Sequence, residues 1–306
     1  MKSPENSRHI TLYEAAADMG VTFTKEWAPE SKFVNANGLN FHYLEWGDQA
    51  SPTILLLHGF AQQAHSWDFV ALSFCDRYRV IVLDQRGHGD SSWSKDGNYS
   101  LDAFQNDLES IVEKLELKTF ILMGLSMGGR NAIMYAANNP DKVSALVVVD
   151  ASPQNMEQGA ANIRNFVEQD DQVSSLEEFV ERIHRFTPRR DPIHIRSSIV
   201  NNVKQLENGK WTWKYDKLLR KHGLPSSTQD SGITDKLWRS VETVICPTLV
   251  VTGAKSDIVS KQTLRRMIQR LQNGHESIVN DAGHLVMGDN PSGFEKAVSA
   301  FIANLT

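Results

Sequence analysis

The stretch "ILMGLSMGGRNAIMYAA", residues 121–137, combines an apolar run, a serine between glycines and a helix-like continuation. Its start is typical of a buried strand, and the residues after Ser126 favour a helix. Gly124 and Gly128 indicate that backbone segments approach each other closely here, because only a residue without a side chain permits such an approach. A serine at this corner is either a turn residue or a nucleophile.

Residues 124–128, Gly-Leu-Ser-Met-Gly, match the G-x-S-x-G pattern of a nucleophile elbow. A serine hydroxyl is a weak nucleophile, so it needs a base at a fixed geometry and hydrogen-bond donors for the developing oxyanion. A sharp turn would expose the hydroxyl of Ser126, and the helix would then begin with the free N–H of Met127. We therefore predict Ser126 as the nucleophile and Met127 as one donor of the oxyanion hole.

Composition limits the class of protein. The chain has 306 residues, 41% of them hydrophobic, which suits one large domain or one domain with an insertion. The net charge of −5 argues against a nucleic-acid surface. Cys75 and Cys246 provide no disulfide framework, which favours a reducing compartment. Without a secretion signal or a run of about 18 apolar residues, we expect a cytoplasmic monomer or homodimer with no membrane contact.

The alternation of apolar runs with helical patterns predicts an α/β fold. Helical patterns cover about 101–116, 127–138, 260–271 and 291–304, and Ser100, Ser260 and Asn290 stand at helix starts. Continuous apolar runs of this kind belong to strands covered by helices on both faces of a largely parallel sheet. The runs are "PTILLLHG", "RVIVLD", "KTFILMG", "SALVVVD" and "PTLVVTG".

The region from 153 to 240 lacks such runs and contains several amphipathic helical patterns. We predict that it forms a helical cap, or lid, inserted between two parts of an α/β core, residues 31–152 and 241–306. Residues 1–30 form an N-terminal extension with one helical pattern near 12–19, either a surface arm or part of the lid.

The partners of Ser126 follow later strands. Asp257 lies beyond "PTLVVTG", and His284 lies in the loop after another strand pattern. The order serine, aspartate, histidine is that of α/β-hydrolases, in which the histidine takes the serine proton and the carboxylate fixes its tautomer. We predict the triad Ser126, Asp257 and His284, with Asp150, at the end of "VVVD", as the alternative acid.

The loop after the first buried strand, "HGFAQQAHSW", offers the second oxyanion donor, the N–H of Phe60. His58 at the strand end suits a structural hydrogen-bonding role. Aromatic side chains suggest an apolar pocket for a small ester or lactone, although they could equally attach the lid to the core. The predicted pocket residues are His65, Trp67, Phe186, Trp211 and Trp213.

The stretch 181–196 contains five arginines and two histidines. One arginine could bind a substrate carboxylate bidentately, or the run could be a solvated face neutralised by nearby acids. The sequence has no metal-ligand constellation and no phosphate-binding loop, so we expect neither a metal nor a cofactor.

Together these motifs make the chain resemble the α/β-hydrolase superfamily, in the branch of small lid-bearing esterases, lactonases and meta-cleavage product hydrolases. The resemblance runs from about Phe33 to Leu305 apart from the lid. It rests on "LLLHGF" (55–60), "VLDQRGHGDSS" (82–92), "GLSMGG" (124–129), "SDIV" (256–259) and "AGH" (282–284). It implies a mostly parallel eight-stranded sheet, a helical lid after the sixth strand, and structural roles for Arg86 and His88.

The function predicted from these residues is hydrolysis of small carboxylic esters or lactones through an acyl-enzyme on Ser126. A C–C hydrolase of vinylogous diketones would use the same triad, and a slow or non-catalytic ligand receptor could share the fold. A hydroxyl at the nucleophile position excludes the haloalkane dehalogenases and epoxide hydrolases, which the resemblance associates with a carboxylate there.

Overall fold

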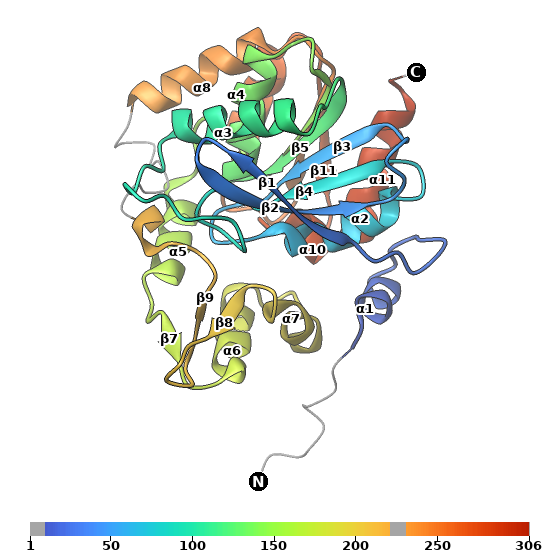
Figure 1. The fold of residues 1–306 in the computed structure, drawn as a ribbon. Helices are drawn as coiled ribbons and strands as arrows, with labels where there is room; N and C mark the ends of the chain where they lie inside the picture. The colour runs from blue at the N-terminus through green and yellow to red at the C-terminus, as the bar shows by residue number, and fades with distance from the viewer. Residues whose placement is uncertain (1–9, 221–230, 306) are drawn as a thin grey trace.

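The computed structural model describes residues 10–220 and 231–305. Its centre is an eight-stranded sheet in the order β1-β2-β4-β3-β5-β6-β10-β11 (Figure 1). β2 is antiparallel to β1 and β4, and the remaining pairs are parallel, as predicted. The strands are β1 (Glu30–Ala36), β2 (Leu39–Trp46), β3 (Thr53–Leu57), β4 (Arg79–Leu83), β5 (Phe120–Leu125), β6 (Val143–Val149), β10 (Thr248–Gly253) and β11 (Gly274–Val279).

Helices cover both faces of this sheet because side chains alternate along each strand. On β3, Leu55 and Leu57 join the core cluster of one face, and Ile54 and Leu56 join that of the other. The first face carries α3 (Leu101–Lys114), α4 (Met127–Asn138), α8 (Ser231–Thr243) and α9 (Lys261–Arg270). The second carries α2 (Asp68–Phe74), α10 (Val286–Asp289) and α11 (Pro291–Ala303).

The predicted helix starts are confirmed at three places. The side chains of Ser100, Ser260 and Asn290 each accept a hydrogen bond from the backbone N–H three residues later. These bonds satisfy amide groups that have no partner inside the helix. Pro291 then occupies the first position of α11, where the missing N–H costs nothing.

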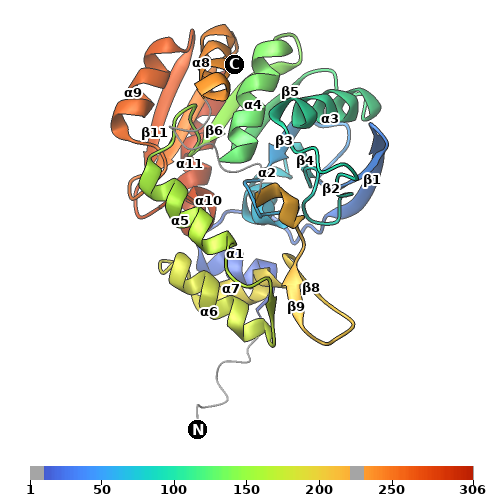
Figure 2. The ribbon, with the colours of Figure 1, turned by 90° about the vertical axis from the view of Figure 1, so that its left-hand side faces the viewer.

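Residues 154–220, called the inserted segment below, lie between β6 and β10 in the chain and on one side of the core in space (Figures 1 and 2). They contain helices and also a small antiparallel sheet in the order β7-β9-β8. The elements are α5 (Glu157–Val167), β7 (Gln172–Val173), α6 (Leu176–Phe186), α7 (Pro192–Ile199), β8 (Val203–Gln205), β9 (Trp211–Trp213) and a 3₁₀ turn at Lys217–Arg220.

The expectation of a purely helical lid was therefore wrong for 203–213. Gly209 has φ +78°, and the Leu206 N–H donates to Lys210 O at 2.7 Å, so the chain reverses into a hairpin. The sequence signal is Asn208-Gly209, a common hairpin turn. The predicted lid boundary at 240 falls inside α8, which packs on α4 of the core.

The N-terminal helix α1 (Leu12–Asp18) begins with a capping box between Thr11 and Glu14. Ala16 is fully buried in the core cluster that includes α2. On its other side, Asp18 lies 3.6 Å from His194 of α7. This helix is thus held between the core and the inserted segment, and both views place it beside α7 (Figures 1 and 2).

Two general features complete the fold. Within residues 10–220 and 231–305, no helix combines the length and apolar character needed to cross a bilayer. Cys75 and Cys246 are both buried free thiols.

Candidate active site

Ser126 stands at the sharp turn between β5 and α4. Its backbone has φ +53° and ψ −113°, a left-handed conformation that residues other than glycine rarely adopt. A Cβ on Gly124 would lie 2.2 Å from Gly128 O, and one on Gly128 would lie 2.4 Å from Leu57 O. The flanking glycines are therefore required where α4 crosses the strands, and the strained turn projects the serine from the sheet edge.

His284, in the loop after β11, is paired with a buried carboxylate. Its Nδ1–H donates to Asp150 Oδ2 at 2.7 Å, and the Ser256 hydroxyl donates to the same oxygen at 2.7 Å. Asp150 is fully buried, which raises the pKa of its carboxyl, and the bonds from His284 and Ser256 oppose that rise. The bond fixes the histidine tautomer with Nε2 free to act as a base.

This pairing corrects the choice of acid. Asp257 makes no contact with His284 within hydrogen-bond distance, and its Oδ2 accepts from Asn162 Nδ2 of α5 at 2.8 Å. Its backbone lies under α5, because a Cβ on Gly159 would be 2.2 Å from Asp257 O. Asp150, the alternative, occupies the partner position, and the "SDIV" loop contributes the Ser256 hydroxyl instead of its aspartate.

Two backbone amides close to Ser126 are available to a ligand. Neither Phe60 N–H nor Met127 N–H donates a hydrogen bond to any of the residues that the structure describes. The loop of Phe60 lies against the serine, since a Cβ on Gly59 would be 3.4 Å from Ser126 Cβ. These are the two predicted oxyanion donors, and their free N–H groups suit that role.

Two buried histidines hold the Phe60 loop in place. His58 Nδ1–H donates to Gly59 O at 2.8 Å, and its Nε2 accepts from Gln85 N–H at 3.0 Å. His88 Nδ1–H donates to Arg86 O, and its Nε2 accepts from Ala61 N–H at 3.2 Å. Burial lowers the pKa of both and brings that of His88 to about 3. Both rings are therefore neutral structural groups.

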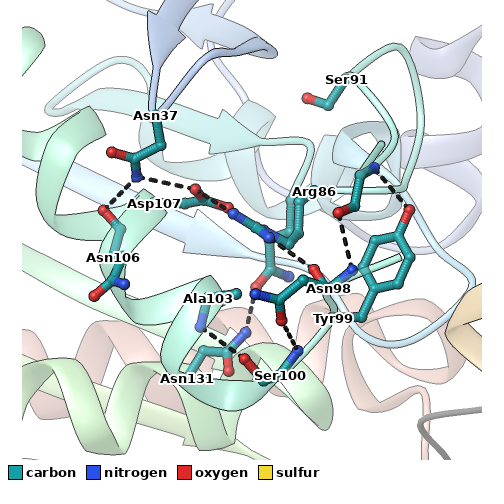
Figure 3. A network of polar contacts seen from close by, with 12 residues as sticks. Asn37, Arg86, Ser91, Asn98, Tyr99, Ser100, Ala103, Asn106, Asp107 and Asn131 are labelled. Atoms are coloured by element: carbon teal, nitrogen blue, oxygen red, sulfur yellow. Dashed lines mark hydrogen bonds and ion pairs between the residues drawn. The ribbon is translucent and has the colours of Figure 1, made fainter. Parts of the chain in front are cut away.

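The loop that carries His88 is anchored by an ion pair (Figure 3). The Arg86 guanidinium binds both carboxylate oxygens of Asp107 on α3, and its Nη1 donates to Asn98 O at 2.7 Å. Asn37 in the β1–β2 turn donates to Asp107 Oδ1 at 3.1 Å. The "DQRGHGDSS" block is thus a scaffold for the loops around Ser126, with no direct place in the site.

A cavity of about 270 Å³ extends from Ser126 and His284 between the core and the inserted segment. Three predicted pocket residues line it, namely His65, Phe186 and Trp213. Trp67 and Trp211 do not, contrary to expectation. Trp67 is fully buried in the core beside Phe294, and Trp211 lies on β9 of the small sheet.

The cavity also includes residues that sequence reasoning missed. Leu12 and Ala15 of α1, and Ile10 just before that helix, line the cavity. The N-terminal extension is therefore part of the cavity wall. The apolar positions of α5 and α6 face it, a pattern that their helical periodicity could have revealed. Other wall residues that sequence reasoning did not place there include Ile163, Phe166, Ile183, Arg190, Ile195, Leu285 and Met287.

One group of potential metal ligands, His42, Asp84 and Asp90, occurs among the described residues. His42 Nδ1–H donates to Asp84 Oδ2 at 2.7 Å, and the backbone N–H of Ala64 and of Asp90 also donate to Asp84. Lys214 pairs with the Asp90 carboxylate at 2.9 Å. These atoms are engaged in hydrogen bonds that connect loops, so the group acts as a structural network.

Comparison with known proteins agrees with this geometry. The family model of the alpha/beta hydrolase fold matches residues 52–291. The chain belongs to the α/β-hydrolase family. This hydrolase is 31% identical over 272 residues to esterase Rv0045c of Mycobacterium tuberculosis, covering 86% of each chain. It is 28% identical to a 3-hydroxybutyrate-oligomer hydrolase of Cupriavidus necator, over 79% of this chain and 86% of the relative.

Solved structures give the same result for the fold. The crystal structure of the M. tuberculosis esterase superposes on the hydrolase with a TM-score of 0.75 at 28% identity, covering 95% of this chain and 96% of the other. E-2-(acetamidomethylene)succinate hydrolase has a TM-score of 0.80 at 22% identity, covering 90% of this chain and all of the other, and shows the fold alone. The esterase relatives support an ester-cleaving hydrolase.

Proposed function

We propose that this protein hydrolyses small carboxylic esters or lactones through an acyl-enzyme on Ser126. The observation that carries the proposal is the strained turn of Ser126 in one cavity with the His284–Asp150 pair. A serine, a histidine and a buried carboxylate are the groups that acyl transfer requires. The similarity to esterases supports the same class of reaction.

In the proposed first step, His284 Nε2 accepts the Ser126 hydroxyl proton as Oγ attacks the substrate carbonyl. The negative charge on the carbonyl oxygen is stabilised by the N–H groups of Phe60 and Met127, at the start of α4. His284 then returns the proton to the leaving alcohol, and the acyl group remains on Ser126. Asp150 keeps Nδ1 protonated and stabilises the imidazolium that forms.

In the second step, water enters after the alcohol leaves. His284 removes a proton from the water, which attacks the acyl carbonyl and forms a second tetrahedral intermediate in the same oxyanion site. Collapse of this intermediate releases the acid and restores Ser126 with its proton. No metal or cofactor takes part in the proposal.

The test compares wild type with Ser126→Ala on p-nitrophenyl esters of increasing chain length and on several lactones. We expect the variant to lose about 10⁴-fold or more in kcat, because the nucleophile is absent. Circular dichroism and the melting temperature establish that both proteins are folded. Full activity of a folded Ser126→Ala protein would rule out the acyl-enzyme.

A further inference from the structure

Among the arginines of 181–196, Arg190 alone lines the cavity that contains Ser126 and His284. It precedes α7, and its backbone is fixed on both sides. Its N–H donates to Thr187 O at 3.1 Å, and its carbonyl accepts from His184 Nδ1 at 3.1 Å. The Arg190 side chain lies close to Gly288 of α10, because a Cβ built on that glycine would be 4.0 Å from Arg190 Nε.

The other arginines of this stretch have different roles. Arg196 pairs with Glu177 on the outer side of α6, and Arg182 donates to Asp170 O. Arg189 pairs with Asp289 at 3.2 Å and closely approaches the backbone of Gly283. Arg185 lies in a neighbouring hollow and does not reach the cavity. The structure thus distinguishes Arg190 from a solvated basic face.

No carboxylate in the described part of the chain lies within ion-pair distance of Arg190. Burial lowers the pKa of Arg190, and the nearby charge of Asp289 partly offsets this effect. The Asp289 carboxylate also pairs with Arg189 and accepts a hydrogen bond from Gly283 N–H. Asp68, the carboxylate on the cavity wall, is paired with His65 at 2.9 Å. His194, a further cavity residue, lies near Asp18. Arg190 therefore has no direct ion pair, and its charged neighbour Asp289 and the wall residue Asp68 each keep one carboxylate oxygen, Oδ1, without a hydrogen-bond partner among the described residues.

The Arg190 side chain is half-buried at the cavity wall and forms no direct ion pair within residues 10–220 and 231–305, so its guanidinium can bind an anionic ligand. A neighbouring hollow, which shares His284, Phe186 and Leu285 with the cavity, supports an anionic ligand. Its wall carries four basic side chains, Arg182, Arg185, Arg189 and Lys255, and the carboxylates of Asp257 and Asp289. Arg189 pairs with Asp289 and Lys255 pairs with Asp281, which leaves Arg182 and Arg185 without an ion pair in the part of the chain that the structure describes. This local positive character, on a chain of net charge −5, would attract anionic substrates.

We infer that Arg190 is a specificity-determining residue that binds a carboxylate of the substrate, so that the preferred substrates are half-esters of dicarboxylic acids or similar esters with one free carboxylate. This inference rests on the proposed ester hydrolysis at Ser126. A guanidinium offers paired N–H donors in the plane that a carboxylate requires. The carboxylate would lie at Arg190 while the ester carbonyl lies at Ser126, which fixes the orientation of the substrate.

The test uses monomethyl glutarate and dimethyl glutarate, which share the acyl chain and the scissile bond and differ in one negative charge. Methanol release gives kcat/KM for each, corrected for the two ester groups of the diester. We expect wild type to prefer the half-ester by about 10- to 100-fold, the range of a charge-assisted hydrogen-bonded pair. Arg190→Met should bring the ratio close to one, and Arg190→Lys should give an intermediate ratio.

Arg196→Met is the matched control, since it removes an arginine of α7 outside the cavity, and it should keep the wild-type ratio. Calorimetric titration of glutarate into wild type and Arg190→Met gives a measure that does not require turnover. Glutarate affinity should fall by about 10- to 100-fold in the variant. Melting temperatures identify a misfolded variant, in which case Arg190→Lys supplies the comparison.

The possible results separate the two proposals. If hydrolysis depends on Ser126 but Arg190→Met keeps the wild-type ratio and glutarate affinity, the carboxylate anchor is wrong and the esterase proposal stands. If neither ester is hydrolysed in a Ser126-dependent way, the esterase proposal fails on these substrates. Glutarate binding then decides whether Arg190 is a carboxylate site: loss of binding in Arg190→Met supports it, and unchanged or absent binding overturns it.

Discussion

The two sides of the cavity are built by different means. On the core side, backbone geometry positions the groups: Ser126 and Asp150 both leave strands in left-handed conformations, with φ +53° and +42°. On the side of the inserted segment, the wall consists of packed side chains, such as Phe166 and Phe186, whose rings stack at 4.4 Å. Under the proposed function, the reaction would therefore depend on the backbone of the core, and substrate choice would depend on side chains that can be exchanged singly.

The largest expected effect is a loss of kcat when the acid of the core side, Asp150, is replaced. Asp150→Asn should lower kcat by about 10⁴-fold, because an amide can hold His284 in the wrong tautomer and cannot stabilise an imidazolium. The matched change Asp257→Asn removes a carboxylate bonded to Asn162 and should alter kcat by only a few-fold. Steady-state kinetics with p-nitrophenyl butyrate measures both. A larger loss in Asp257→Asn than in Asp150→Asn would reverse the assignment of the acid.

A second prediction concerns the pH dependence of stability on the core side. In the folded protein, burial lowers the pKa of His88 to about 3, whereas the unfolded chain has an ordinary value near 6.5. The neutral ring therefore stabilises the fold fully above pH 6.5, and this contribution is lost as the pH falls toward 3. At pH 5 the loss from this one group is about 2 kcal/mol.

Urea unfolding at pH 7.5 and pH 5.0 measures this loss. His88→Gln has no titrating ring, so its free energy of unfolding should decrease less than that of wild type between the two values, by about 2 kcal/mol. His275→Gln is the control, because that ring is exposed. If His88→Gln loses as much stability as wild type on acidification, the ring does not stay neutral in the fold.

The smallest effect concerns the other wall. Ala15 of α1 is buried and lines the cavity, so Ala15→Phe should fill part of the space available to the acyl chain. We expect the activity ratio of p-nitrophenyl octanoate to acetate to fall by about tenfold, the scale on which pockets discriminate chain length. Ala17→Phe places the same ring on the exposed face and should keep the wild-type ratio. Equal ratios in the two variants would show that α1 does not limit the substrate.

Much of the core side was predictable because its constraints are local. The glycines around Ser126 indicate a tight turn, and the capping residues of three helices indicate where those helices begin. The choice between Asp150 and Asp257 was not local, since both follow a buried strand and β6 and β10 are neighbours in the sheet. Only the three-dimensional structure shows that the Asp150 carboxylate reaches His284.

The wall formed by the inserted segment was less predictable. Five arginines in sixteen positions look equivalent in sequence, and their different environments arise from how α6, α7 and the core loops pack. The hairpin of β8 and β9 did carry a signal in Asn208-Gly209, which the amphipathic pattern around it obscured. The structure of the inserted segment depends on side-chain packing between residues far apart in sequence, which hydrophobic periodicity alone cannot predict.

The position of Asp150 has an evolutionary consequence. With the acid before the inserted segment and the histidine far beyond it, residues 154–220 contain none of the proposed reacting groups but do contain Arg190. Recombination that replaced this stretch would exchange the carboxylate anchor and a large part of the cavity wall while leaving the acid–base pair intact. New substrate ranges could then arise by inheritance of whole segments, with the ancestral chemistry preserved.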